Sequence, residues 1–142
     1  MSATQIFVNL PVADIDKAKA FYTSLGFSLN PQFSDDKTGC VVIAENICAM
    51  IMTHDRFKDF TSRDVATDGI EVINSIGVTT RDGVDHLANT AFANGGAEVR
   101  PTEDMGWMYQ RSFTDPDGHH WEAVHVDEEA MAEAFASGDT PA

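Results

Sequence analysis

Basic residues are scarce in this sequence: 9 Lys and Arg stand against 23 Asp and Glu, and the formal net charge is -14. Such a chain repels phosphate backbones and anionic lipid headgroups, so we expect no nucleic-acid partner and no membrane partner. Long apolar runs are also missing, since none approaches the roughly 20 residues that span a bilayer. The opening residues, MSATQIFVNLPV, lack the basic and apolar segments of a secretory signal. These absences favour a cytoplasmic protein.

Cysteine is limited to two residues, Cys40 and Cys48, and both lie in apolar, strand-like segments. A chain of 142 residues with 43% hydrophobic content is large enough to fold around a core without disulfide bonds. We therefore expect reduced thiols and one compact domain rather than a disordered chain.

The sequence repeats its pattern once. Residues 7–31 and 75–101 each contain an apolar strand, an Asp, a stretch of helical periodicity, a glycine stop and a second strand ending in Pro. Three matched pairs lie 68 positions apart and a fourth lies 70 apart: Phe7 with Ser75, Asn9 with Gly77, Asp14 with Asp82, and then Pro31 with Pro101. Asp14 and Asp82 are predicted to be the N-caps of the two helices.

Four further strands are predicted, over residues 39–44, 47–53, 109–113 and 120–126. Each half is then a βαβββ module, at about 4–54 and 70–126, and the two modules form one domain over 1–126. The linker, 55–69, contains Phe57 and Phe60, which are predicted to form a helical turn against a pocket or the core. The tail, 127–142, is expected to hold a short helix at 131–135 and to end in disorder.

Two motifs carry a resemblance to a known superfamily. The segment VADIDKAKAFYTSLGF resembles its opening strand, turn and helix, and DPDGHHWEAV at 115–124 resembles its last hairpin. In this order and spacing they resemble the vicinal oxygen chelate superfamily, which includes glyoxalase I, extradiol dioxygenases and bleomycin-resistance proteins. More narrowly, the stretches IFVNLPV, MTHDRF and GWMYQRSFTDPDGHHWE and the linker between the halves resemble a bacterial subgroup of predicted lactoylglutathione lyase-related proteins. The resemblance implies an α+β fold in which two βαβββ modules form a concave mixed sheet, a homodimer, and a small-molecule cleft.

Glyoxalase-type members of that superfamily hold a divalent metal through the first and last strand of each module. Carried over residue by residue, the four ligand positions are Phe7, Met50, Ser75 and Glu122. A phenyl ring donates nothing, a thioether suits a hard ion poorly, and one carboxylate with a hydroxyl does not hold such an ion tightly. A register slip of two residues brings Asn9 into the set without completing it. We therefore expect no cofactor.

A shifted metal site stays open as an alternative. His119, His120, Glu122 and His125 crowd the last strand, where His120 and Glu122 alternate onto one face. His54 could complete a divalent-metal site with this pair only if the strand before His54 runs close by. Otherwise His119 lies at an exposed hairpin turn and His120 lines the cleft or an interface.

Strand alternation also defines a cleft face with apolar walls and few polar groups, as suits a small molecule. The candidate ligand-binding residues on this face are Phe7, Asn9, Met50, Met52, Ser75 and His120. Trp107 and Tyr109 are candidate stacking rings, although aromatic residues in strands more often belong to the core. Arg111 is the candidate anchor for a ligand carboxylate.

Glu122 is the candidate catalytic residue. Phe and Met neighbours would desolvate its carboxylate, which suits a general base, whereas a structural pair with Arg111 or Tyr109 is the alternative. Three functions follow. The one we favour is binding or sequestering of a small molecule, as in bleomycin-resistance proteins. The others are a lyase, isomerase or dioxygenase-like enzyme with the shifted metal, and a metal-free enzyme with Glu122 as base.

Overall fold

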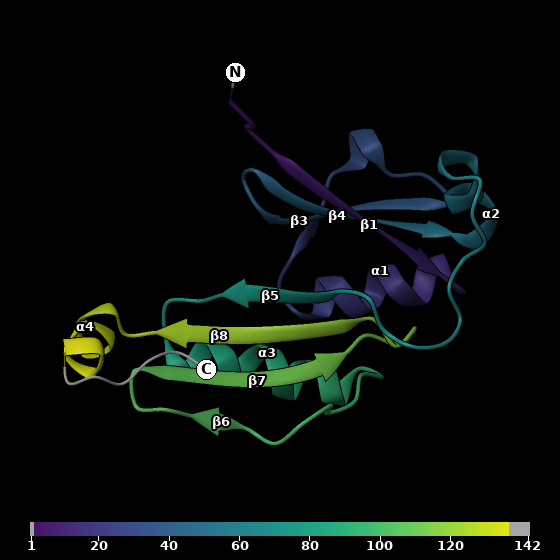
Figure 1. Ribbon diagram of the computed structural model, residues 1–142. Helices are drawn as coiled ribbons and strands as arrows, with labels where there is room; N and C mark the ends of the chain where they lie inside the picture. Colours follow the sequence, from purple (N-terminus) through teal and green to yellow (C-terminus); the bar gives the residue numbers. More distant parts are fainter. Residues whose placement is uncertain (1, 137–142) are drawn as a thin grey trace. The chain divides into compact units, whose positions relative to one another are not determined.

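The chain divides into two compact units, Met1–Ile70 and Glu71–Ala142, and the computed structural model describes residues 2–136. Each unit contains a strand, a helix and three further strands in that order, as predicted for a βαβββ module (Figure 1). Both sheets have four strands in the same arrangement, β1-β4-β3-β2 and β5-β8-β7-β6. The predicted α+β class with mixed sheets is confirmed.

The first unit is built from β1 (Ile6–Val12), α1 (Ile15–Ser24), β2 (Ser28–Leu29), β3 (Thr38–Ala44) and β4 (Ile47–Thr53). β1 runs parallel to β4, whereas β3 is antiparallel to both of its neighbours. The predicted strands at 39–44 and 47–53 match β3 to within one residue and β4 at both ends.

Helix α1 packs on one face of the first sheet. Asp14 caps it as predicted, because its side chain accepts a hydrogen bond from the backbone N–H of Lys17 at 3.1 Å. The buried side of the helix consists of residues spaced three and four apart, namely Ile15, Ala18, Phe21, Tyr22 and Leu25. Alternate strand residues supply the other half of this core: Leu10, Val12, Val41, Ala49 and Ile51.

The second unit is built from β5 (Ile73–Gly77), α3 (Arg81–Ala93), β6 (Glu103–Asp104), β7 (Met108–Thr114) and β8 (His120–Val126). Helix α3 packs against β7 and β8 and buries Val84, Leu87, Ala88 and Ala91. Phe113, Trp121 and Ala123 are the buried strand residues of this core. The predicted strand at 109–113 lies within β7, and the one at 120–126 coincides with β8.

The predicted cap of the second helix at Asp82 is wrong. The N-cap is Thr80, whose hydroxyl accepts a hydrogen bond from the backbone N–H of Gly83 at 2.9 Å. Asp82 lies instead in the first turn, where a negative charge is also favourable. Thr and Asp are both good caps, so the composition of TTRD did not distinguish between the two positions.

The repeat offset of 68 is wrong for the same reason. The two observed caps, Asp14 and Thr80, are 66 residues apart. The same offset superposes the buried helix positions: Ala18 on Val84, Phe21 on Leu87, Tyr22 on Ala88, and Leu25 on Ala91. Burial repeats more faithfully than residue identity, because the helix must present the same side to its sheet in both modules.

Two short segments flank the modules. The linker begins with α2 (His54–Phe57) and the 3-10 turn η2 (Lys58–Phe60), so the predicted helical turn is present. Asp127 precedes α4 (Glu128–Ala136) and accepts a hydrogen bond from the backbone of Ala130, and this helix includes the predicted 131–135 span. The end predicted to be disordered, 137–142, lies outside the described residues. In the described part of the chain, no helix has the length and apolar character that crossing a bilayer requires.

Candidate functional site

The first sheet turns one face away from α1, and we call it the far face. Its residues, from three strands, are Phe7, Asn9, Pro11, Thr38, Cys40, Val42, Cys48, Met50 and Met52. Met50 lies at the centre, opposite Asn9 on one side and opposite Cys40 on the other. Laterally paired residues point to the same side of a sheet, so the first-module residues predicted for the cleft do share one face.

A hollow with a volume of about 230 Å³ opens over the far face. Met50, Met52 and Thr38 line it from the strands. Residues 32–35, Arg56 and Phe60 line it from the segments that flank the sheet. Pockets for drug-sized ligands are roughly 300–1,000 Å³, so this hollow suits a smaller molecule or encloses a larger one in part.

Local hydrogen bonds fix one wall of the hollow. Asn30 caps the 3-10 turn η1 (Pro31–Phe33) through its side chain. The Ser34 hydroxyl donates to the carbonyl oxygen of Asn30 at 2.7 Å and accepts from the backbone N–H of Cys40 at 3.0 Å. These hydrogen bonds hold the turn that contains Phe33. Phe33 is 60% exposed, so its ring does not pack in the core.

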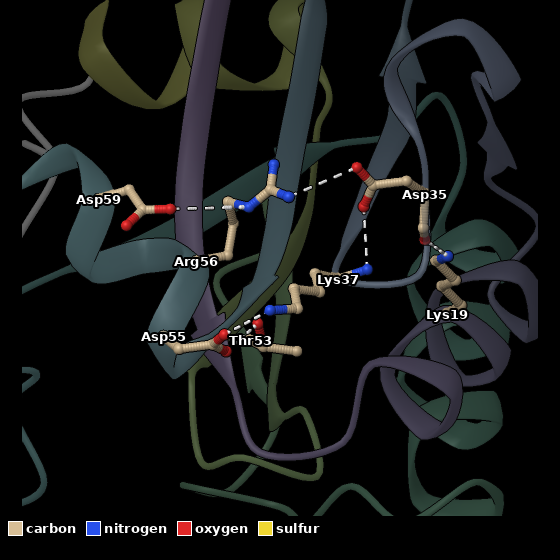
Figure 2. A network of polar contacts seen from close by, with 7 residues as sticks. All are labelled: Lys19, Asp35, Lys37, Thr53, Asp55, Arg56 and Asp59. Carbon is tan, nitrogen blue, oxygen red and sulfur yellow. Dashed lines mark hydrogen bonds and ion pairs between the residues drawn. The ribbon is translucent and has the colours of Figure 1, made fainter.

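A network of polar contacts ties the loop over 34–37 to α2 (Figure 2). Lys37 Nζ donates to Asp55 Oδ2 at 2.7 Å, and the Thr53 hydroxyl donates to Asp55 Oδ1 at 2.6 Å. On the other side of the loop, Lys19 Nζ of α1 donates to the backbone oxygen of Asp35 at 2.6 Å. These hydrogen bonds therefore fix the position of the loop relative to α2, and residues of both segments line the hollow.

One charge of each sign lines the hollow, Arg56 and Asp35. Arg56 Nη2 lies 3.7 Å from Asp35 Oδ2, and its Nε lies 3.9 Å from Asp59 Oδ2. The pKa of Asp35 lies below its ordinary value, chiefly because the backbone N–H of Lys37 donates to the carboxylate; the charge of Arg56 adds to the effect. Asp35 is therefore ionised at neutral pH, and the wall is polar on both sides of Arg56.

The Lys37–Asp55 pair should persist in acid. Hydrogen bonds from Lys37 and Thr53 hold the pKa of Asp55 far below its ordinary value. A carboxyl with a lowered folded-state pKa stabilises the fold above its unfolded-state pKa, about 3.9, and the contribution is lost as the pH falls through the folded-state pKa. In a carboxyl-carbon NMR titration we expect Asp55 to stay ionised at pH 3 and Lys37→Met to raise its midpoint. A wild-type midpoint near 4 would contradict the network.

In the second unit, Glu122 and His120 lie on the sheet face turned away from α3. Glu122 lies opposite Ser75 on β5 and opposite Ser112 on β7. His120 Nε2 is buried and has no hydrogen-bond partner among the described residues. The predicted neighbourhood of Ser75, His120 and Glu122 within this module is therefore present.

Tyr109 and Arg111 lie on the opposite face of the second sheet, against α3. Tyr109 donates to Asp85 Oδ1 at 2.6 Å and Arg111 donates to the same oxygen at 3.0 Å. The Tyr109 hydroxyl is the largest cause of a lowered pKa at Asp85. The predicted structural pair of Glu122 with either residue is wrong, because odd and even positions of β7 and β8 face opposite sides.

Two more predicted residues, Trp107 and His125, make contacts within the second unit. Trp107 lies edge-to-face on Phe135 of α4 with ring centroids 5.5 Å apart, so its ring packs on the tail helix. His125 lies on the α3 face, where its Nδ1 is 3.0 Å from the carbonyl oxygen of Val78. His125 therefore does not join His120 and Glu122.

The register revises the metal positions implied by the resemblance. Ser75 lies opposite Glu122, and the equivalent pair in the first unit is Asn9 opposite Met50, so Asn9 replaces Phe7. An amide, a thioether, a hydroxyl and one carboxylate do not fit a divalent metal of the glyoxalase type. In residues 2–136, no three or more His, Cys, Asp and Glu side chains are arranged to hold a metal. His120 and Glu122 alone give the shifted site only two donors.

Sequence reasoning missed Phe33, Asp35 and Arg56 as candidates. They lie on segments without strand or helix periodicity, and the metal pattern did not include them. A signal was present, since QFSDDK and HDRFKDF place aromatic and charged residues on both flanks of the strands at 38–53. Phe60 was predicted to fold back on a pocket or the core, and it lines the hollow.

Comparison with known proteins defines the class. A family model described as bleomycin resistance protein-like N-terminal matches residues 4–44. A hypothetical protein from S. aureus is 30% identical, with a TM-score of 0.75 over 89% of this chain and 96% of that chain. A glyoxalase/bleomycin resistance protein/dioxygenase family enzyme from Burkholderia phytofirmans PsJN is 21% identical, with a TM-score of 0.71 over 84% and 96%. A glyoxalase-related enzyme from Fulvimarina pelagi is 19% identical, with a TM-score of 0.74 over 87% and 88%. A search of proteins with curated functions finds no match.

The two βαβββ modules have the fold of the glyoxalase/bleomycin resistance/dioxygenase structures. The narrower lactoylglutathione lyase-related subgroup, the homodimer and the cytoplasmic location stay predictions.

Proposed function

We propose that this chain binds or sequesters a small molecule in the hollow over the far face of the first sheet. The observation that carries the proposal is the hollow itself, a 230 Å³ space with a thioether floor and two exposed rings at its walls. The bleomycin-resistance-like match, 4–44, includes the wall residues 32–35 and thus supports this location.

The lining chemistry favours an aromatic or largely apolar ligand. Phe33 and Phe60 are 60% and 73% exposed, so binding would remove apolar surface that the core leaves in water. Met50 and Met52 supply polarizable thioethers that adapt to a ring and attract it. Met52 is only 4% exposed and is held by its neighbours in the sheet, whereas Phe33 and Phe60 at the edge of the hollow are exposed.

A neutral bicyclic probe, 2-naphthamide, tests this function by isothermal titration calorimetry. We expect saturable binding that weakens roughly tenfold in Phe60→Ala and in Phe33→Ala, since one aromatic contact contributes about 0.5–1.5 kcal/mol beyond its buried area. Ile70→Ala is the matched control, because Ile70 is an exposed apolar residue of the same unit, outside the hollow.

Glu122→Gln separates this function from catalysis by a general base. Glu122 opposite Ser75, with His120 on the same face, is what supports the catalytic alternative. We expect 2-naphthamide to bind Glu122→Gln as it binds the wild type. Binding lost in Glu122→Gln and kept in both phenylalanine variants would move the site to the second unit and overturn the proposal.

A further inference from the structure

The guanidinium group of Arg56 makes no hydrogen bond to any residue within 2–136. In the described part of the chain it makes two ion-pair contacts, at 3.7 Å to Asp35 and 3.9 Å to Asp59, and neither is a hydrogen bond. Its side chain is 34% exposed and lines the hollow. A guanidinium has five N–H donors in a planar fork, so most of its recognition capacity is unused by the fold.

Arg81 provides a comparison, because its guanidinium group makes several hydrogen bonds. Arg81 donates to both carboxylate oxygens of Asp104, at 2.7 and 2.8 Å, and to the carbonyl oxygen of Gly106 at 3.0 Å. Arg56 has carboxylates within reach but no such geometry. Figure 2 shows its fork between Asp35 and Asp59, with the dashed contacts reaching it from two different sides.

The two carboxylates near Arg56 are held elsewhere or exposed. Asp35 Oδ1 accepts the backbone N–H of Lys37 at 2.9 Å, which keeps that carboxylate on its own loop. The Asp59 side chain is 70% exposed, and solvent screening makes such a pair weak. A ligand oxygen that reaches Arg56 at hydrogen-bond distance would therefore displace only weak contacts.

We propose that the hollow binds an aromatic carboxylate, whose carboxylate accepts a bidentate hydrogen bond from Arg56 while its ring lies on Met50 and Met52. The inference rests on the proposed function and adds the charge of the ligand to it. Planar, two-pronged recognition of carboxylate is what an arginine fork does best. The net charge of -14 repels anions at long range, but screening limits that repulsion to about 8 Å at 0.15 M salt, and the contact partner decides the binding.

The test compares three bicyclic probes of one shape: 2-naphthoate, 2-naphthamide and 2-naphthylmethylamine. Calorimetry at 0.15 M salt should rank 2-naphthoate first. Arg56→Gln should weaken 2-naphthoate by roughly 10- to 100-fold, the range of a hydrogen bond to a charged group, and leave 2-naphthamide nearly unchanged. Arg56→Lys, which keeps the charge and loses the fork, should fall between. Asp35→Asn removes the competing charge and should tighten 2-naphthoate binding by up to about fivefold.

Arg63→Gln is the matched control, because it removes the same charge from the linker at a position outside the hollow. An equal loss in Arg63→Gln and Arg56→Gln would reduce the effect to net charge and overturn the anion inference. Tighter binding of the amine than of 2-naphthoate, or no effect of Arg56→Gln, would overturn it while leaving the hollow as a binding site. Absence of binding by all three probes would overturn the proposed function as well.

Discussion

Gly96→Ala should destabilise the second unit by about 3 kcal/mol, within the range of an overpacked core. A Cβ at this position would lie 2.3 Å from the carbonyl oxygen of Thr114 and 2.9 Å from that of Ala91. Both are backbone atoms, so neither moves away by a rotamer change. The contact is close because Gly96 follows α3 and its N–H donates to Ala91 O at 2.8 Å, just where the chain returns to β7.

Urea unfolding followed by tryptophan fluorescence measures this effect, because the two tryptophans of the chain, Trp107 and Trp121, are both in the second unit. Gly77→Ala is the matched control: a Cβ there meets nothing within 4 Å, and an ordinary strand backbone accepts alanine. We expect Gly77→Ala to be neutral or to stabilise by up to about 1 kcal/mol. Equal midpoints for Gly96→Ala and Gly77→Ala would show that the packing of α3 against β7 is looser than described.

Asp115→Ala should cost about 2–4 kcal/mol, because two backbone N–H groups lose their acceptor in a turn with little access to water. The Asp115 side chain is 2% exposed, and its Oδ1 accepts from Asp117 N at 3.0 Å and from His119 N at 2.8 Å. Gly118 completes the turn with a φ of 85°, a conformation that glycine adopts without strain. The DPDG motif is therefore a clamp between β7 and β8.

Asp115→Asn is the informative companion, since its amide oxygen keeps the acceptor and removes the charge. We expect Asn to recover most of the midpoint that Ala loses in the same fluorescence assay. If Asp115→Ala keeps the wild-type midpoint, backbone hydrogen bonds alone hold this hairpin. If Asn is as damaging as Ala, the negative charge and not the acceptor is what the turn requires.

The two modules contain different candidate functional groups. The first has the hollow, the thioether floor and an under-used arginine. The second has Glu122 with Ser75 on one sheet face and the Asp85, Tyr109 and Arg111 cluster on the other. The fold is thus present although, within residues 2–136, no three or more His, Cys, Asp and Glu side chains are arranged to hold a metal.

Most of the fold was predictable from the sequence. The alternating pattern of strands and the helical periodicity located the two modules, because both signals are local and each occurs in both halves. The predicted first and last residues of β4 and β8 agree with the structure. The offset was wrong by two residues because Thr80 and Asp82 are chemically alike as caps, and only packing of the helix chose between them. The family motif at 115–118 was recognisable, but its role as a clamp needed the distances from Oδ1.

Unlike the fold, most of the candidate site could not be predicted from the sequence. By itself the sequence determined that Met50 stands where a metal ligand would be expected and that Met50 and Met52 share a face, since strand alternation is fixed by the backbone. It placed Phe7 at the other ligand position of the first unit, and the register assigns that position to Asn9 instead. Only the tertiary structure decided that Tyr109 and Arg111 point to α3 and that Phe33, Asp35 and Arg56 surround a hollow. The reason is physical: alternation is local, whereas the loop over 34–37 and α2 meet only after β3 and β4 pair and bring distant segments together.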